Sequence, residues 1–420
     1  MNRYSLSILA GVTLALGTLI TTVARAETLL IDNATVHTMA QQGVLENTDI
    51  LIRDGVVVTI GENLSAPDAQ RIDAAGRHVT PSLFAGITSI GLTEVSGVKE
   101  SVDSSISDID MPQMRPEFRV DPAFNPNSSL VPIARVEGLG FTVLGATANG
   151  SIFGGQGRMA RLDGSYDSLF GGEILFISIG RQVSSLSGGS RAGQWMLLEQ
   201  AVAEARTPPR ASEPALLTRS GRETLKRFTR GGTVVFSVDR ASDILQVLRF
   251  ARENGFKPVI NGGAEAWMVA TQLADADVPV LLDPLENLPS NFDTLGARLD
   301  NAALLHAAGV TVVVAGGESH NARKQRQMAG NAVANGLPHA AGLAALTSAP
   351  ASVFGVKAGT LKEGQRADLV LWSGDPLEVT TVADLVIVNG QPDSMESRQT
   401  LLRDRYLPQQ PSLPRAYVKP

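Results

Sequence analysis

Short apolar, β-branched runs separated by polar turn residues occupy both ends of the chain. On the N-terminal side, "TLLIDNATVHTM" (residues 28–39) and "DILIRDGVVVTIG" (residues 49–61) are broken by Asp-Asn and Asp-Gly, which favour turns. On the C-terminal side, "GTLKEGQRADLVLWSGDP" (residues 359–376) and "VADLVIVNGQ" (residues 382–391) repeat the pattern with Gly turns. The pattern predicts one small β-domain that is built from both ends of the chain.

The middle of the chain changes to strands and helices in turn. The apolar run "TVVFSV" (residues 233–238) precedes "ASDILQVLRFARENG" (residues 241–255), whose apolar residues fall on one helical face before a Gly that can end the helix. The runs "KPVIN", "VPVLLD" and "VTVVVAGG" then alternate with further helix-like segments. This order predicts βαβ units and a parallel sheet with both faces covered. A barrel and an open doubly wound sheet fit it equally well.

The segment between these two parts, residues 95–225, is less regular. "DIDMPQMRPEFRVDPAFNPNSS" (residues 108–129) is rich in Pro and Asp and predicts a long surface loop. The Gly-rich "GSIFGGQGRMARLDG" (residues 150–164) lacks the Gly-Lys-Ser/Thr of a phosphate-binding loop and the spacing of a dinucleotide-binding fingerprint. It therefore predicts a region of β-turns.

The first 26 residues have the composition of a cleaved signal peptide. Arg3 precedes an apolar run over residues 6–20, and "ARA" ends at Ala26. The run is short for a membrane span of about 20 residues and contains Ser, Gly and Thr. We expect the mature chain to begin near Glu27, to be periplasmic or secreted, and to have no membrane partner after cleavage.

Charge and cysteine content exclude several functions. Removing residues 1–26 removes Arg3 and Arg25 and no acidic residue, which takes the formal charge from −6 to −8. The mature chain is acidic and has no basic stripe, so we expect no nucleic-acid partner. The absence of cysteine excludes disulfides, thiolate metal sites and cysteine nucleophiles.

Turn and strand residues near the C-terminus carry a resemblance to a known family. The segment "APASVFGV…AGTLKEGQRADLVLWSGDPLE" and the opening "LLIDNATVHT…ILIRDGVVVTIG…IDAAGRHVTPSLF" resemble the amidohydrolase superfamily, specifically its imidazolonepropionase-like branch, over nearly all of the mature chain. The positions that match the C-terminal motif are Ala351, Gly355, Gly359, Leu361, Gly364, Ala367, Asp368 and Leu369. Their role in the family is structural, so this match does not establish catalysis.

The resemblance implies a fold with two parts. Residues 81–357 would form an α/β, (β/α)8 TIM-like barrel. Residues 27–80 and 358–395 would form a small, discontinuous β-sandwich, and residues 396–420 a C-terminal tail.

In the resembled family, zinc or another divalent metal sits at the barrel mouth on histidines after strands 1, 5 and 6 and an Asp after strand 8. Carried over one position at a time, strand 1 offers Ile87 and Ser89, strand 5 offers Ser237, and strand 6 offers Gly262. Glu318 takes the place of the Asp. Because every histidine position is replaced, we predict no bound metal and no cofactor, and a ligand pocket lined by the four replacements.

Three other residues near the strand ends are candidates for catalysis. Asp239 follows the predicted fifth strand, and Glu318 and His320 follow the eighth. A carboxylate beside an imidazole could do acid-base chemistry without a metal, or could belong to a network that holds the mouth together. The other four histidines lie away from the strand ends, at His37, His78, His306 and His339.

The resemblance implies a hydrolase of non-peptide carbon–nitrogen bonds, and the replaced residues indicate a degenerate, metal-depleted pseudoenzyme that has a ligand-binding or scaffold role. The alternative is an active hydrolase with an altered site at Asp239, Glu318 and His320. A small-molecule ligand is one expected partner. A homo-oligomer, or pairing with a paralogous amidohydrolase, would fit a scaffold subunit.

Overall fold

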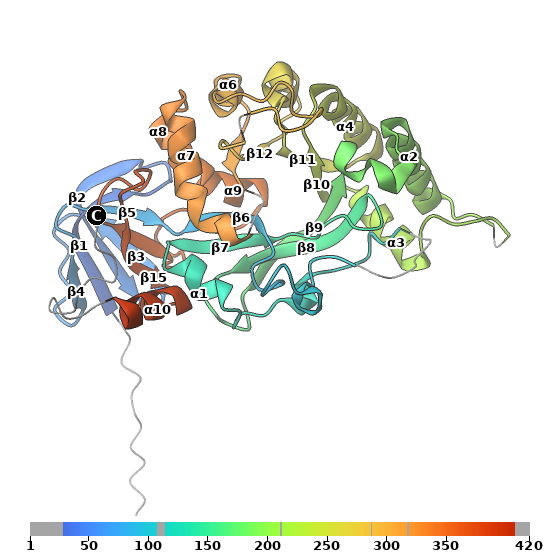
Figure 1. Ribbon diagram of the computed structural model, residues 1–420. Helices are drawn as coiled ribbons and strands as arrows, with labels where there is room; N and C mark the ends of the chain where they lie inside the picture. Colours follow the sequence, from blue (N-terminus) through green and yellow to red (C-terminus); the bar gives the residue numbers. More distant parts are fainter. Residues whose placement is uncertain (1–27, 107–113, 211, 287, 317–318, 408–420) are drawn as a thin grey trace, which may run out of the picture.

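The computed structural model describes residues 28–106, 114–210, 212–286, 288–316 and 319–407. The predicted signal peptide lies outside these residues. Within them the strands form two eight-stranded sheets, and no helix is long and apolar enough to cross a membrane. Figure 1 shows the strands from both chain ends together at one end of the molecule, with the second sheet and most helices beside them.

The first sheet, which we call sheet A, combines the two chain ends as predicted. Its order is β16-β15-β14-β5-β1-β2-β3, and β4 also pairs with β1. Its strands are β1 (Thr28–His37), β2 (Val44–Arg53), β3 (Val56–Gly61), β4 (Gln70–Asp73), β5 (His78–Pro81), β14 (Leu369–Trp372), β15 (Ala383–Val388) and β16 (Gln391–Pro392).

Sheet A folds back on itself around its own apolar core. The predicted Asp-Gly turn joins β2 to β3, and both Asp54 and Gly55 have the positive φ that a tight hairpin turn requires. Val56 in β3 then forms a bridge with Arg366, just before β14. Apolar side chains from β1, β2, β3, β14 and β15 share the enclosed core.

The second sheet, sheet B, forms a nearly closed barrel of eight strands in chain order. The strands are β6 (Leu83–Thr88), β7 (Leu139–Leu144), β8 (Phe153–Arg161), β9 (Leu169–Ser178), β10 (Thr233–Val238), β11 (Lys257–Gly262), β12 (Val280–Leu282) and β13 (Val312–Val314). All neighbours are parallel except β8, which runs antiparallel to both β7 and β9. The predicted barrel is confirmed, with its third strand reversed.

Strand β8 corrects the predicted region of β-turns. Gly157 lies so close to β7 that a Cβ atom there would stand 1.8 Å from the carbonyl oxygen of Leu144. Gly154 has a similar close approach, at 2.5 Å from the carbonyl oxygen of Ala146. The glycines therefore allow a strand to pass close to its neighbour, which is a role that Gly-rich strand segments often have.

Helices cover the outside of the barrel. The α-helices are α1 (Leu130–Arg135), α2 (Arg191–Arg206), α3 (Arg219–Phe228), α4 (Ala241–Asn254), α5 (Ala270–Asp275), α6 (Asn301–Ala307), α7 (Gln325–Ala334), α8 (His339–Ala345), α9 (Ser348–Val353) and α10 (Arg398–Tyr406). The 3-10 helices are η1 (Lys99–Ser101), η2 (Asp121–Ala123), η3 (Arg181–Ser187), η4 (Ala266–Val269) and η5 (Ser319–Lys324). Figure 1 shows α2, α4, α6 and α7 on the side of β10–β13.

Helix α4 forms as its sequence predicts. Ile244, Val247 and Ala251 are buried against the barrel. Gly255 ends the helix with a φ of 74°, and its N–H donates to the carbonyl oxygen of Ala251. This is the left-handed termination that glycine permits at low cost.

The seam between β6 and β13 closes the barrel through other contacts. The N–H of Phe84 in β6 donates to the carbonyl oxygen of Leu346, 2.7 Å away. The side chain of Gln325, which is fully buried, donates from Nε2 to the carbonyl oxygen of Ala85 at 3.0 Å. These contacts join β6 to α7 and to the residue that follows α8, which are segments that come after β13 in the chain.

Candidate functional site

Strand alternation decides which side chains reach the inside of the barrel. On β10, Val234 and Phe236 belong to the outer core beneath the helices, whereas Val235 belongs to the barrel interior. Ser237 and Asp239 continue the inward phase of Val235, because successive strand residues point to opposite faces. The two residues therefore stand at the C-terminal end of β10, where barrel enzymes place their chemistry.

Three polar side chains stand in register across adjacent strands at this end. Ser178 of β9 is opposite Ser237 of β10, which is opposite Asn261 of β11. Asn261 donates from Nδ2 to the hydroxyl of Ser237 at 3.2 Å. The row forms a polar floor above the apolar interior of the barrel.

The larger of two neighbouring recesses at the mouth is lined mainly by hydroxyl groups, and we call it the hydroxyl recess. It has a volume of about 540 Å³. Its Ser and Thr side chains come from β6, β9, β10 and the segments that follow β6, β7 and β13, and they are Thr88, Ser89, Thr93, Ser96, Ser104, Thr147, Ser178, Ser237 and Ser319. Asn261, Glu94 and His320 also line it.

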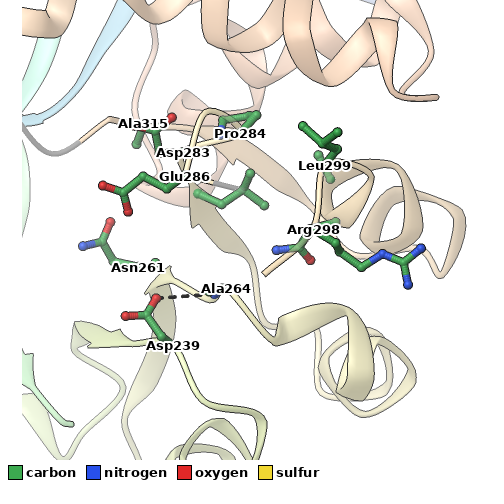
Figure 2. Close-up of a pocket in the computed structure, with 13 residues that line it drawn as sticks. Asp239, Asn261, Ala264, Asp283, Pro284, Glu286, Arg298, Leu299 and Ala315 are labelled. Atoms are coloured by element: carbon green, nitrogen blue, oxygen red, sulfur yellow. Dashed lines mark hydrogen bonds between the residues drawn. The ribbon is translucent and has the colours of Figure 1, made fainter. Parts of the chain in front are cut away.

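The smaller recess, which we call the acidic recess, has a volume of about 130 Å³ and shares Asn261 with the hydroxyl recess. Asp239, Asp283 and Glu286 line it together with Gly262. Figure 2 shows Asp239, Asn261 and Glu286 along one side, while the Arg298 side chain extends away from them. Arg298 instead bonds to Asp300, so its charge is neutralised outside the recess.

The two replacement residues of the first barrel strand have different surroundings. Ser89 is held by Ser319, whose Oγ accepts the N–H of Ser89 at 2.7 Å and lies 2.9 Å from its hydroxyl. Ile87 packs at the edge of the barrel interior and against Gly145, where a Cβ atom would stand 2.7 Å from Ile87 Cγ2. Both residues line the hydroxyl recess.

The other two predicted pocket residues lie in different recesses. Ser237 lines the hydroxyl recess, and Gly262 lines the acidic one. Gly262 has a φ of 99°, and a Cβ atom there would stand 2.5 Å from Asp239 Oδ1. The side chain that β11 directs into the mouth is that of Asn261, one position earlier. The period of two in "PVIN", counted from the inward Val259, could have identified it.

Burial shifts the pKa of two of the three carboxylates that line the acidic recess. It raises the pKa of Asp239 above its ordinary value, against a hydrogen bond from the N–H of Ala264 and with a further rise from the charge of Glu265. Burial also raises the pKa of Asp283, opposed by the N–H of Leu285 and then by the charge of Lys324. Asp283 is the first residue after β12, and sequence reasoning missed it. The end of the apolar run "VPVLL" could have identified it as a strand-end residue.

The three candidate catalytic residues do not share one recess. His320 lines the hydroxyl recess, and Asp239 lines the acidic recess. Glu318, which was predicted to take the place of the metal-binding Asp, lies outside the described residues. In the described part of the chain, no three His, Cys, Asp or Glu side chains converge so that they could hold a metal ion. A zinc site needs at least three such ligands, and the described side chains by themselves do not supply them.

Three histidines lie away from the mouth, at the junction of sheet A with helix α8. His37 Nε2 and His78 Nδ1 are 2.8 Å apart, and His339 Nε2 lies 2.8 Å from Asp375 Oδ2. Burial, together with the charges of His78 and His339, lowers the pKa of His37 to about 4. These residues belong to the packing of the two parts of the molecule.

Comparison with known proteins identifies relatives by family and by fold. Residues 294–392 match the model of the amidohydrolase family, and no curated protein matches the chain. A solved amidohydrolase from Thermotoga maritima is 24% identical with a TM-score of 0.76, and the match covers 87% of this chain and 99% of that one.

Two further solved structures share the fold at lower identity. A mutant atrazine chlorohydrolase from Arthrobacter aurescens, complexed with zinc and atraton, is 16% identical with a TM-score of 0.52 over 90% of this chain and 98% of that one. N-isopropylammelide isopropylaminohydrolase from Burkholderia multivorans is 17% identical with a TM-score of 0.50, and the match covers 87% of this chain and 98% of that one. Residues 294–392 are thus similar to the amidohydrolase family, and the chain shares the fold of these solved structures.

Proposed function

We propose that this chain is an exported, metal-depleted amidohydrolase of the imidazolonepropionase-like branch, and that its barrel mouth binds a small molecule without hydrolysing it. The observation that carries the proposal is the set of inward side chains at the strand ends. Ile87, Ser89, Ser237 and Asn261 offer a hydrocarbon, two hydroxyls and an amide. None of these groups is an imidazole or a carboxylate, so they are poor zinc ligands.

The carboxylates of the mouth support the same proposal. Asp239 and Asp283 line the acidic recess, whereas His320 lines the hydroxyl recess. A general acid-base pair must reach the same reacting atoms, within hydrogen-bond distance or through one water. The separation of Asp239 from His320 between two recesses therefore argues against the altered hydrolytic site that the sequence left open.

A recess of this kind can bind and orient a ligand. Its volume lies in the range of about 300–1,000 Å³ that is common for small-molecule sites. Hydroxyl and amide groups that converge on a concave surface fix a ligand by hydrogen bonds. They supply no Lewis acid, and a neutral serine hydroxyl without a base is a weak nucleophile.

Elemental analysis of the purified mature protein tests the proposal. We expect less than about one tightly bound transition metal per chain, and no amide or ureide hydrolysis that a chelator abolishes. The informative variant is Ile87→His with Ser89→His, which restores two nitrogen ligands on β6. We expect its zinc content to exceed that of the parent protein. Stoichiometric zinc in the parent together with chelator-sensitive hydrolysis would refute the proposed function.

A further inference from the structure

We propose that the hydroxyl recess binds an uncharged, hydroxyl-rich molecule of about monosaccharide size. The inference rests on the proposed function, because it names the class of ligand that the same mouth takes. It starts from hydroxyl groups in the recess that have no hydrogen-bond partner among the described residues.

Two hydroxyls of the recess belong to the segment that follows β6. Thr93 is 9% exposed, and its Oγ1 is buried without a hydrogen-bond partner among the described residues. Ser104 is 8% exposed and also lines the recess. Leaving a buried polar group unpaired costs about 1–3 kcal/mol. A ligand that supplies donors and acceptors at this wall would offset that cost.

The floor of the recess presents a second set of polar groups from a different part of the fold. The hydroxyl of Ser178 on β9 has no partner within the described residues, and neither has the side-chain oxygen of Asn261 on β11. Between them, Ser237 accepts the Nδ2 hydrogen of Asn261. Ligand hydroxyls fit this row because a hydroxyl rotor can donate or accept at each position.

The distribution of charge favours a neutral ligand. Among the described residues, the charged or titratable side chains that line the hydroxyl recess are Glu94 and His320, and both are exposed. The floor and inner wall carry neutral groups, so an ionised ligand placed there would lose hydration without gaining a counter-charge. An anion would in addition face Asp239 and Asp283 in the adjoining recess.

Apolar side chains complete the recess. Ile87, Ala146 and Phe176 line it beside the hydroxyl groups. A sugar ring combines hydroxyls at its edge with a hydrocarbon face, so it can use both kinds of surface at once. The combination of hydroxyls, hydrocarbon and little charge distinguishes a sugar or related polyol from a charged metabolite.

A matched set of sugars tests the inference on the purified mature protein. Titration calorimetry and thermal unfolding would compare D-glucose and N-acetyl-D-glucosamine, which are neutral, with cationic D-glucosamine and anionic D-glucuronate. We expect a neutral sugar to bind and to raise Tm, and the two charged sugars to bind at least about tenfold more weakly.

Two variants locate the site. Ser104→Ala and Ser178→Ala should each weaken binding of the neutral sugar by about fivefold, the effect of one lost hydrogen bond. Ser352→Ala is the matched control, because Ser352 is exposed on α9 and does not line the recess. It should bind as the parent protein does.

The outcomes separate the inference from the proposed function. Preferential binding of a charged sugar that Ser178→Ala weakens would overturn the neutral class, and ligand binding at the mouth would stand. Binding of neutral sugars that neither recess variant weakens would place the site elsewhere and overturn the inference, as would the absence of binding by every sugar. The proposed function fails only on the separate evidence of metal and hydrolysis.

Discussion

The junction between sheet A and the barrel differs from the mouth of the barrel in the hydrogen bonds that its polar side chains make. At the junction, the Trp372 indole is fully buried and donates to Thr80 Oγ1 at 2.9 Å, and His37 is paired with His78. At the mouth, Thr93 and Ser178 keep hydroxyls without partners in the described residues. The named side chains at the junction are paired within the chain, whereas the hydroxyls at the mouth are available to the ligand that we propose.

The largest effect should follow from truncating the centre of the junction. Trp372→Ala removes a fully buried indole that touches Gly138 and lies under the guanidinium of Arg326, whose Cζ is 4.8 Å from the ring centre. We expect the free energy of unfolding to fall by about 3–5 kcal/mol, measured by urea denaturation. Trp372→Phe keeps part of the ring and should lose less. A loss below about 1 kcal/mol for the alanine variant would mean that the junction does not stabilise the fold.

A pH titration sharpens the comparison next. Folding lowers the pKa of His37 from 6.5 to about 4, so the unfolded chain takes up a proton before the folded chain does. The stability that this residue contributes is therefore present above pH 6.5 and is lost as the pH falls through the window down to about 4. The facing groups are His78, His339 and Asp375. The loss is at most about 3 kcal/mol.

Comparison of the parent protein with His37→Asn separates the pH-dependent stability that is due to His37 from that due to the carboxylates. The variant should have a shallower slope of unfolding free energy against pH in the window from 6.5 to about 4. Asparagine can still hydrogen-bond to His78 but cannot be protonated there. Equal slopes for the two proteins would show that His37 does not titrate with folding.

Much of the fold could be predicted from local pattern, because the relevant forces act along one element. The apolar run of β10 and the amphipathic face of α4 both formed where the sequence places them. Strand β8 was missed because its glycines are needed where the strand passes close to Leu144 and Ala146 of the neighbouring segment. A local sequence pattern does not record such contacts between segments.

The site could be predicted only in part, for a similar reason. Ile87, Ser89 and Ser237, which were predicted to line a ligand pocket, line the same recess, while Gly262 lines the other. The division of the mouth into two recesses depends on how β11 and β12 end in space, and this places Asn261 between the recesses and separates Asp239 from His320. Motif matching follows positions along the chain, and it does not report which side chains face the same space.

The smallest effect should come from neutralising the acidic recess. The pKa of Asp239 is raised by folding, chiefly through burial, so its charge destabilises the folded chain above the raised pKa. That destabilisation fades as the pH falls toward the ordinary value of 3.8. Asp239→Asn should thus be more stable than the parent protein at pH 7, by no more than about 1 kcal/mol, and the advantage should vanish in acid.

Chemical denaturation at pH 7 and in acid measures the difference in stability between Asp239→Asn and the parent protein. Asp275→Asn is the control, because Asp275 is an exposed acid at the end of α5. The control should match the parent protein within about 0.5 kcal/mol. The opposite result for Asp239→Asn, a loss of more than about 1 kcal/mol at pH 7, would mean that a cation stabilises this carboxylate in solution. The acidic recess would then be occupied, and the contrast between a self-sufficient junction and a mouth with unmet polar groups would hold for the hydroxyl recess alone.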